Sequence, residues 1–202
     1  MSYRDFTIRD LKQKFGLRIE EESDLFSEVT GIKVGPSLSE TLAETVPLAL
    51  AISTEKARSE LIIAPMLLEA RRCADRRVGF FSGVDFSVDP QRGLNGVCDF
   101  LLSRSHEQLS IEAPVIAVVV AKNEDMRAGI GQCLAEMVAV RIFNERGGRS
   151  EESIYGAVTT GNTWRFLRLR NDEAEVDRAE YYINEVGRIL GILKAMLDGT
   201  AG

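Results

Sequence analysis

The chain has 202 residues, of which 45% are hydrophobic and 28% are charged, and its formal net charge is −6 at pH 7. This length allows one ordinary domain with a large core, and the composition excludes disordered, collagen-like and low-complexity proteins. The longest apolar run, residues 114–121, is far shorter than the ~20 residues of a membrane-spanning helix, and no secretory-signal pattern is present, so we expect a cytoplasmic protein that does not enter a membrane.

The N-terminal part of the chain is predicted to be mainly helical. A short helix is expected over Thr7–Phe15, and residues 17–35 combine a strand-like piece, an acidic run and a turn. Apolar spacing predicts a further helix from Ser39, with Pro47 as a kink or break. A wide apolar stripe predicts a long helix over Thr54–Ala74.

The rest of the chain alternates between strand and helix patterns. The continuous β-branched run Val115–Ala121 is typical of a central strand that is covered on both faces. Further strands are predicted over residues 78–88, 97–102, 154–160 and 164–169, and helices over residues 126–144 and 177–197. This order predicts an α/β fold with a mixed sheet and helices on both faces. We divide it into an N-terminal helical extension, residues 1–52, and an α/β core, residues 53–202.

Cysteine, histidine and charge patterns limit the possible chemistry. Cys73, Cys98 and Cys133 are far apart in apolar segments, and His106 is the only histidine. This spacing does not match a structural zinc site, so we interpret the cysteines as core thiols. Acidic residues dominate the N-terminal part, whereas arginines cluster at residues 71–77 and 165–170. These clusters suit a phosphate-rich partner, although solvated helix ends give the same pattern.

Four polar residues fall where this architecture would place a site. Asp99 interrupts an apolar strand, Lys122 ends the central strand, and Gln132 and Glu136 lie one helical turn apart. An aspartate inside a strand needs a partner, because burial of an unpaired charge is costly. Lys122 can be that partner in a structural ion pair at the sheet edge. Alternatively, the two residues can hold a divalent cation and a water molecule.

Five strings in the same order resemble the PD-(D/E)xK, or restriction-endonuclease-like, nuclease superfamily, and are similar to nuclease domains of type I restriction subunits. The strings are Thr54–Leu67 (TEKARSELIIAPML), Gly96–Phe100 (GVCDF), Pro114–Lys122 (PVIAVVVAK), Gly129–Met137 (GIGQCLAEM) and Gly156–Phe166 (GAVTTGNTWRF). The resemblance covers about Ser53 to Leu169. It implies a restriction-endonuclease-like fold and metal-dependent hydrolysis of a phosphodiester.

The resemblance also implies roles for individual residues. Asp99 would hold Mg²⁺ together with the carbonyl group of Ala121 and with Glu55 or Glu60 from the first long helix. Lys122 would orient or help to deprotonate the attacking water, with Gln132 beside it.

One position departs from the family pattern. The family has a metal-binding acid two residues before the lysine, and this chain has Val120 there. Since residues 120 and 122 of a strand point the same way, an apolar side chain would face the metal position. A carboxylate from Glu136 or Glu124, or the amide of Gln132, would then have to replace the missing ligand.

Three functional hypotheses follow. The first is a degenerate phosphodiesterase site retained for binding DNA or a protein, with the arginine clusters as phosphate contacts. The second is an active Mg²⁺-dependent DNA endonuclease with a migrated carboxylate. The third is a homo-oligomeric scaffold that uses the acidic N-terminal helices together with 42–52 and 183–197 and does not contact nucleic acid.

Overall fold

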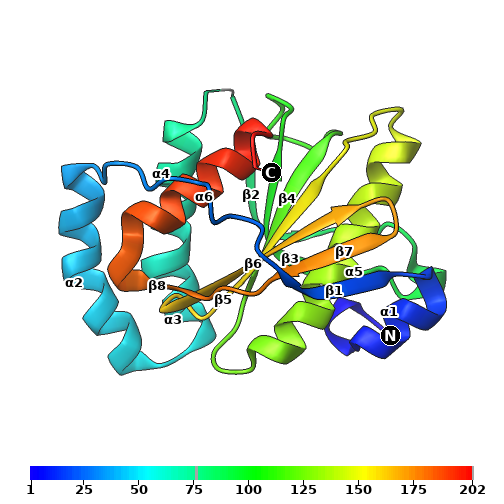
Figure 1. Ribbon diagram of the computed structural model, residues 1–202, viewed down its shortest axis with the longest axis horizontal. Helices are drawn as coiled ribbons and strands as arrows, with labels where there is room; N and C mark the ends of the chain where they lie inside the picture. Colours follow the sequence, from blue (N-terminus) through cyan, green and yellow to red (C-terminus); the bar gives the residue numbers. More distant parts are fainter. Residues whose placement is uncertain (76, 202) are drawn as a thin grey trace.

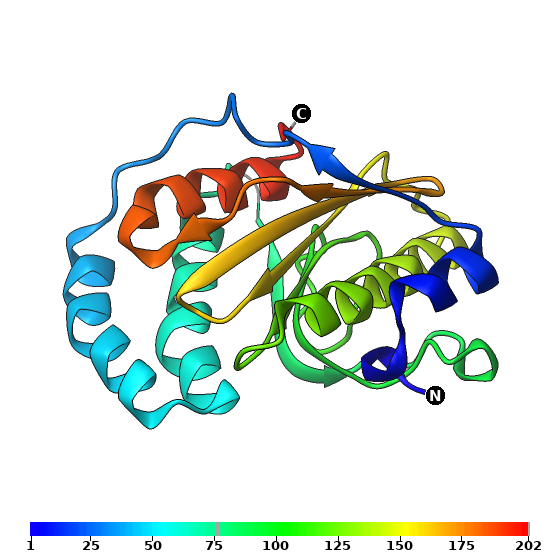
Figure 2. The same cartoon turned by 60° about the horizontal axis from the view of Figure 1, so that its bottom comes forward.

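The computed structural model describes residues 1–75 and 77–201 and contains one mixed β-sheet between two layers of helices (Figures 1 and 2). The strands are β1 (Arg18–Ser23), β2 (Gly79–Asp85), β3 (Val97–Ser103), β4 (Val115–Ala121), β5 (Ile154–Thr159), β6 (Thr163–Arg170), β7 (Glu173–Asp177) and β8 (Tyr181–Tyr182). Their order is β1-β7-β6-β5-β4-β3-β2, and β8 pairs with β6. The predicted α/β class with a mixed sheet is therefore confirmed.

The helices cover both faces of this sheet. They are α1 (Ile8–Phe15), α2 (Pro36–Ile52), α3 (Glu55–Arg58), α4 (Ala64–Cys73), α5 (Met126–Arg146) and α6 (Val186–Asp198), with short turns η1 (Tyr3–Asp5), η2 (Ser59–Ile63), η3 (Pro90–Arg92) and η4 (Ile183–Glu185). Figures 1 and 2 show α2, α4 and α6 on one side of the sheet and α1 and α5 on the other. Within the described residues, no helix is both long enough and apolar enough to cross a membrane.

The central strand is β4, as its sequence predicts. Every residue of Val115–Ala121 is at most 1% exposed, and the strand is antiparallel to β3 and parallel to β5. Alternate side chains enter the two cores: Ala117 and Val119 pack on the α6 side, and Val118 and Val120 pack on the α5 side. The sheet is thus held by two apolar layers, which explains the absence of polar residues from this run.

Helix α5 approaches the sheet closely because two of its residues are glycines. A Cβ atom at Gly129 would lie 2.5 Å from Cγ1 of Val158 on β5, and a Cβ atom at Gly131 would overlap the carbonyl oxygen of Phe6. The Val158 side chain and the Phe6 backbone are both closely packed, so moving either of them would cost free energy. The two glycines therefore allow α5 to pack between β5 and the N-terminal segment.

The predicted helix over Asp177–Leu197 is wrong in its first half. Asp177 is the last residue of β7, Tyr181–Tyr182 form β8, and α6 begins only at Val186. The buried Asp177 carboxylate accepts hydrogen bonds from the backbone N–H of Ala179 and the hydroxyl of Tyr181. These contacts turn the chain back toward β6 and prevent an earlier helix start.

The predicted helix over Thr54–Ala74 is interrupted by a wider turn. Thr54 caps α3, the π-helical η2 follows, and α4 ends at Cys73. Pro47 does not break α2, which continues to Ile52. Of the three cysteines, Cys98 and Cys133 are buried and Cys73 is half-buried, and all three are free thiols.

Residues 1–52 contribute a strand as well as helices. The acidic β1 pairs in parallel with β7, with Arg18 opposite Glu173 and Ile19 opposite Ala174. The N-terminal part of the predicted helical extension is therefore joined to the same sheet as the core.

Candidate functional site

Asp99 lies where β3 and β4 run side by side. The two strands are antiparallel, and Oδ2 of Asp99 accepts a hydrogen bond of 2.8 Å from the backbone N–H of Ala121. Burial raises the pKa of Asp99, the Ala121 hydrogen bond lowers it, Glu55 raises it, and Lys122 and Arg4 lower it. The structure thus gathers three of the residues predicted from sequence, Glu55, Ala121 and Lys122, around Asp99.

A chain of hydrogen bonds extends from Lys122 into the core. The Nζ atom of Lys122 donates to Oε1 of Gln132 over 2.7 Å, and Nε2 of Gln132 donates to Oε1 of Glu136 over 2.9 Å. Gln132 and Glu136 are one turn apart on α5, so both side chains face the sheet. The close approach allowed by Gly129, whose absent Cβ would lie 3.0 Å from Cγ of Lys122, places the lysine against this helix.

Glu136 is completely buried, and its carboxyl group is largely protonated at neutral pH. Burial raises the pKa of Glu136 to about 8, the Gln132 hydrogen bond lowers it, Asp99 raises it, and Cys98 and Lys122 lower it. Its Oε2 atom has no hydrogen-bond partner among the described residues. Asp99 and Lys122 form no direct ion pair, because Asp99 accepts from the Ala121 N–H and Lys122 donates to Gln132. Glu136 interacts electrostatically with both residues and is more deeply buried than either.

Val120 is the residue that the resemblance places where the family has an acid. It is 0% exposed and packs in the core beneath α5. A carboxylate at this position would enter an apolar layer, unless Lys122 and Gln132 moved to meet it. The structure therefore shows an apolar, fully buried side chain at position 120, whereas the conflict with a family-type metal site stays a prediction of the resemblance.

The other acids considered from sequence are placed differently. Glu55, at the N-terminus of α3, forms an ion pair of 3.7 Å with Arg4. Glu60 pairs with Lys56 over 2.6 Å on the exposed side of the helix, and Glu124 lies exposed in the loop before α5. Of these three, Glu55 is the one coupled to Asp99.

These side chains do not fit a Mg²⁺ ion well. Among residues 1–75 and 77–201, no group of three or more His, Cys, Asp or Glu side chains is placed to hold a metal. Asp99 already accepts from the Ala121 N–H, and Glu136 is protonated in the core. Mg²⁺ prefers ionised oxygen ligands in open octahedral geometry, so we derive no chemical step through a metal.

A basic groove lies beside this cluster, between η1, α1 and the start of α5. We call it the α1–α5 groove; its volume is about 780 Å³. Its lining includes four basic residues, Arg4, Arg9, Lys12 and Arg127, and three acids, Asp5, Glu21 and Asp125. Two of these acids are engaged at helix N-termini: Asp125 caps α5, and Asp5 of η1 accepts hydrogen bonds from the backbone N–H and the hydroxyl of Ser2. Arg4, which lines the groove, also pairs with Glu55 of the candidate site.

Sequence analysis missed this groove. Arg4 and Lys12 are far in sequence from Arg127 and the other α5 residues of the groove, and these segments meet only in the folded chain. The available signal was the Gly129–Gly131 pair inside an apolar helix, which indicates close packing of another segment.

The two arginine clusters expected to contact phosphate lie elsewhere. The first cluster, residues 71–77, comes just before β2. The first residue of β2, Gly79, pairs with Ser103, which is four residues along β3 from Asp99. Arg76 lies outside the described residues. Side chains at 165–170 are engaged within the sheet, as in the donation from Arg165 Nε to the Asp177 carbonyl. Neither cluster lines the α1–α5 groove.

Comparison of the chain with known protein families, characterised proteins and solved structures gives no match. Function must therefore be argued from the geometry of this site.

Proposed function

We propose that this protein is a nucleic-acid-binding relative of the restriction-endonuclease-like nucleases whose cleavage site has degenerated. The observation that carries the proposal is the combination of Asp99 on β3, Lys122 directly after the neighbouring β4, and a fully buried Val120 at the position where the resemblance expects the second acid. The order of elements supports it: a helix, the meander β2-β3-β4, α5 and the parallel strand β5 follow the pattern that the resemblance implies.

The α1–α5 groove is the surface that we propose for the nucleic acid. Arg9, Lys12 and Arg127 are exposed along it, and Arg4 connects it to Asp99 through Glu55. Three phosphate contacts would make affinity fall about 20-fold for single-stranded and 40-fold for double-stranded DNA between about 50 and 200 mM salt.

The binding test uses fluorescence polarisation with labelled single- and double-stranded DNA over a salt series. The Arg9→Gln/Lys12→Gln double variant is expected to lose most of the affinity and to flatten the salt dependence. Lys33→Gln, which removes an exposed charge outside the groove, is the matched control and should bind like the parent. Absence of binding at low salt, or a double variant that binds normally, would refute the proposal.

A DNA cleavage assay distinguishes a degenerate site from an active endonuclease. The coupling between Glu136 and Asp99 is the feature that favours a migrated carboxylate, but complete burial and a raised pKa oppose it. We expect no cleavage of DNA with Mg²⁺ or Mn²⁺. Cleavage that disappears in both Asp99→Asn and Glu136→Gln would establish the enzyme instead.

The scaffold hypothesis loses part of its proposed surface. Apolar residues of α6, among them Leu190, Leu193 and Leu197, are at most 3% exposed because they pack within the same chain. Of the two apolar segments considered, 42–52 keeps exposed large apolar side chains, such as Leu48 and Ile52, whereas the exposed residues of 183–197 are polar.

A further inference from the structure

A second basic pocket lies at the C-terminal end of α4. We call it the α4 pocket; it has a volume of about 470 Å³ and is lined by the end of α4, the segment that connects α4 with β2, and the loop between β3 and β4. Among the residues that the structure describes, it shares none with the lining of the α1–α5 groove. The proposed nucleic-acid function therefore does not use this pocket.

The three segments meet closely because β2 begins with a glycine. A Cβ atom at Gly79 would lie 2.9 Å from Nε2 of Gln108 and 3.0 Å from the carbonyl oxygen of Ser105. The loop between β3 and β4 can therefore pack directly against the start of β2. This packing brings His106 of the loop to the same pocket as Arg77, which comes just before β2.

The basic side chains of the α4 pocket keep open hydrogen-bond donors. Nε of Arg71 donates to the carbonyl oxygen of Val78 over 2.6 Å, which fixes the guanidinium group. Within residues 1–75 and 77–201, the two terminal nitrogens of Arg71 have no partner. Across the same part of the chain, the exposed side chains of Arg77 and His106 form no hydrogen bond or ion pair. A ligand can therefore bind to these donors without breaking an existing contact.

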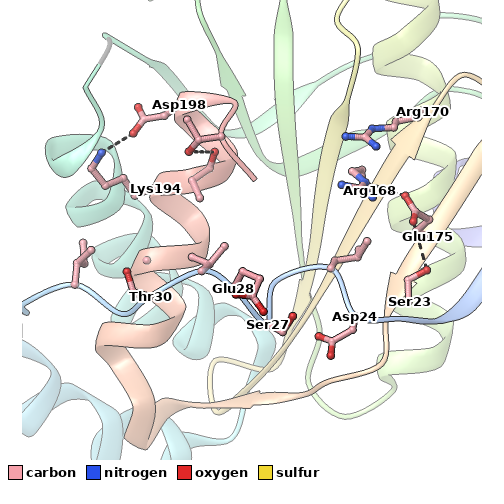
Figure 3. Close-up of a pocket in the computed structure, with 16 residues that line it drawn as sticks. Ser23, Asp24, Ser27, Glu28, Thr30, Arg168, Arg170, Glu175, Lys194 and Asp198 are labelled. Atoms are coloured by element: carbon pink, nitrogen blue, oxygen red, sulfur yellow. Dashed lines mark hydrogen bonds and ion pairs between the residues drawn. The ribbon is translucent and has the colours of Figure 1, made fainter. Parts of the chain in front are cut away.

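The charge balance of the α4 pocket favours an anion. Its lining has three arginines and His106 against one carboxylate, that of Asp75. Lys194 holds this carboxylate over 2.9 Å, and Figure 3 shows the same lysine with its other partner, Asp198 on α6. The cavity drawn in Figure 3 has the opposite balance, with four carboxylates against three cationic side chains. An anion is therefore attracted to the α4 pocket and not to that cavity.

The end of the helix accounts for only two of the basic residues. Arg71 and Arg72 lie in the last turn of α4, where cations compensate the helix dipole, and one terminal nitrogen of Arg72 donates to Glu69. Arg77 and His106 lie beyond the helix, in the connecting segment and in the loop between β3 and β4. Their presence in the same pocket is therefore not explained by the helix end.

We propose that the α4 pocket binds the phosphate group of a phosphate monoester. Arg71 and Arg77 would donate to the phosphate oxygens from two segments, and His106 would add a donor from a third. A monoester offers nearly two negative charges and three open oxygens, which suits several donor groups better than a planar carboxylate, for which one guanidinium fork is enough. The phosphate can belong to a small molecule or to the 5′ end of a nucleic acid.

Calorimetric titration of the full chain with ribose 5-phosphate and with ribose tests the proposal. Ribose 5-phosphate should bind and ribose should not, because the phosphate group is what the pocket recognises. Arg77→Gln should weaken the binding about tenfold or more, the typical loss of a charge-assisted contact. This variant should fold normally, because the Arg77 side chain is exposed. Arg149→Gln makes the same change at an exposed position outside the pocket and should bind like the parent.

Competition separates the two sources of the phosphate. It is measured in the Arg9→Gln/Lys12→Gln background, so that the α1–α5 groove does not contribute and failure of the proposed function leaves this test intact. Displacement of ribose 5-phosphate by a 5′-phosphorylated oligonucleotide, but not by its 5′-hydroxyl form, identifies a nucleic-acid end. Displacement by neither form identifies a small phosphate monoester.

Three results would overturn the proposal. The first is no binding of ribose 5-phosphate to the parent chain. The second is equal binding by Arg77→Gln and the parent, which would place the ligand outside the α4 pocket. The third is equal displacement by the two forms of the oligonucleotide, which would mean that the pocket recognises backbone diesters.

Discussion

Replacement of Glu136 by glutamine tests the electrostatics of the candidate site directly. The two side chains have the same shape, and a glutamine oxygen can still accept the hydrogen bond from Nε2 of Gln132. What changes is the cost of keeping a carboxyl group protonated in the core. We therefore expect the variant to be more stable than the parent, by an amount that grows with pH.

The magnitude follows from the two pKa values of the carboxyl group. Its pKa is about 8 in the folded chain and 4.5 as the ordinary reference. Because the folded value is raised, the unfolded state binds fewer protons above pH 4.5, and parent stability falls as pH rises from 4.5 to 8. Linkage gives a difference of about 2 kcal/mol at pH 6, about 3 kcal/mol at pH 7 and at most about 5 kcal/mol above pH 8.

Urea unfolding at several pH values between 5 and 9 measures this difference as the gap between the two stability curves. Glu145→Gln, on the same helix but exposed, is the matched control and should stay within about 0.5 kcal/mol of the parent at every pH. Parallel curves for the parent and Glu136→Gln would refute the reasoning. A parent that gains stability relative to Glu136→Gln as pH rises would mean an ionised Glu136 and would restore it as a metal ligand.

Three further outcomes are expected. Asn144→Ala should lower the free energy of unfolding, measured with urea, by about 2–4 kcal/mol. The buried amide of Asn144 accepts a hydrogen bond of 2.8 Å from the backbone N–H of Val115 and donates one of 2.7 Å to the Val115 carbonyl. A decrease of less than about 1 kcal/mol would contradict this role. Gly131→Ala should destabilise the protein by about 1–3 kcal/mol, because the added Cβ overlaps the Phe6 carbonyl oxygen. Helix propensity alone would instead stabilise the variant by about 1 kcal/mol. A variant more stable than the parent would therefore contradict the close packing. Addition of Mg²⁺ at pH 7 should leave the thermal unfolding midpoint unchanged, and a rise that disappears in Asp99→Asn would show that the site binds the metal.

The sequence located the members of the candidate site but not their surroundings. A polar residue inside an apolar strand, a lysine at a strand end and an i, i+4 pair on a helix each stand out locally, and Asp99, Lys122, Gln132 and Glu136 do meet. The complete burial of Glu136 depends on how closely α5 approaches the sheet. Since this distance is set by packing between distant segments, no local pattern could provide it.

The sequence by itself determined the elements whose stability comes from their own residues. The β-branched run predicts β4, and the Gly161–Asn162 turn predicts the hairpin of β5 and β6. Tertiary structure alone decided the sheet edge, where the acidic β1 pairs with β7 although glutamate has low strand propensity. The partner of Arg18 in this pairing, Glu173, is 155 positions away. Such contacts gain free energy only after the chain has closed a long loop, so they leave little trace in the local sequence.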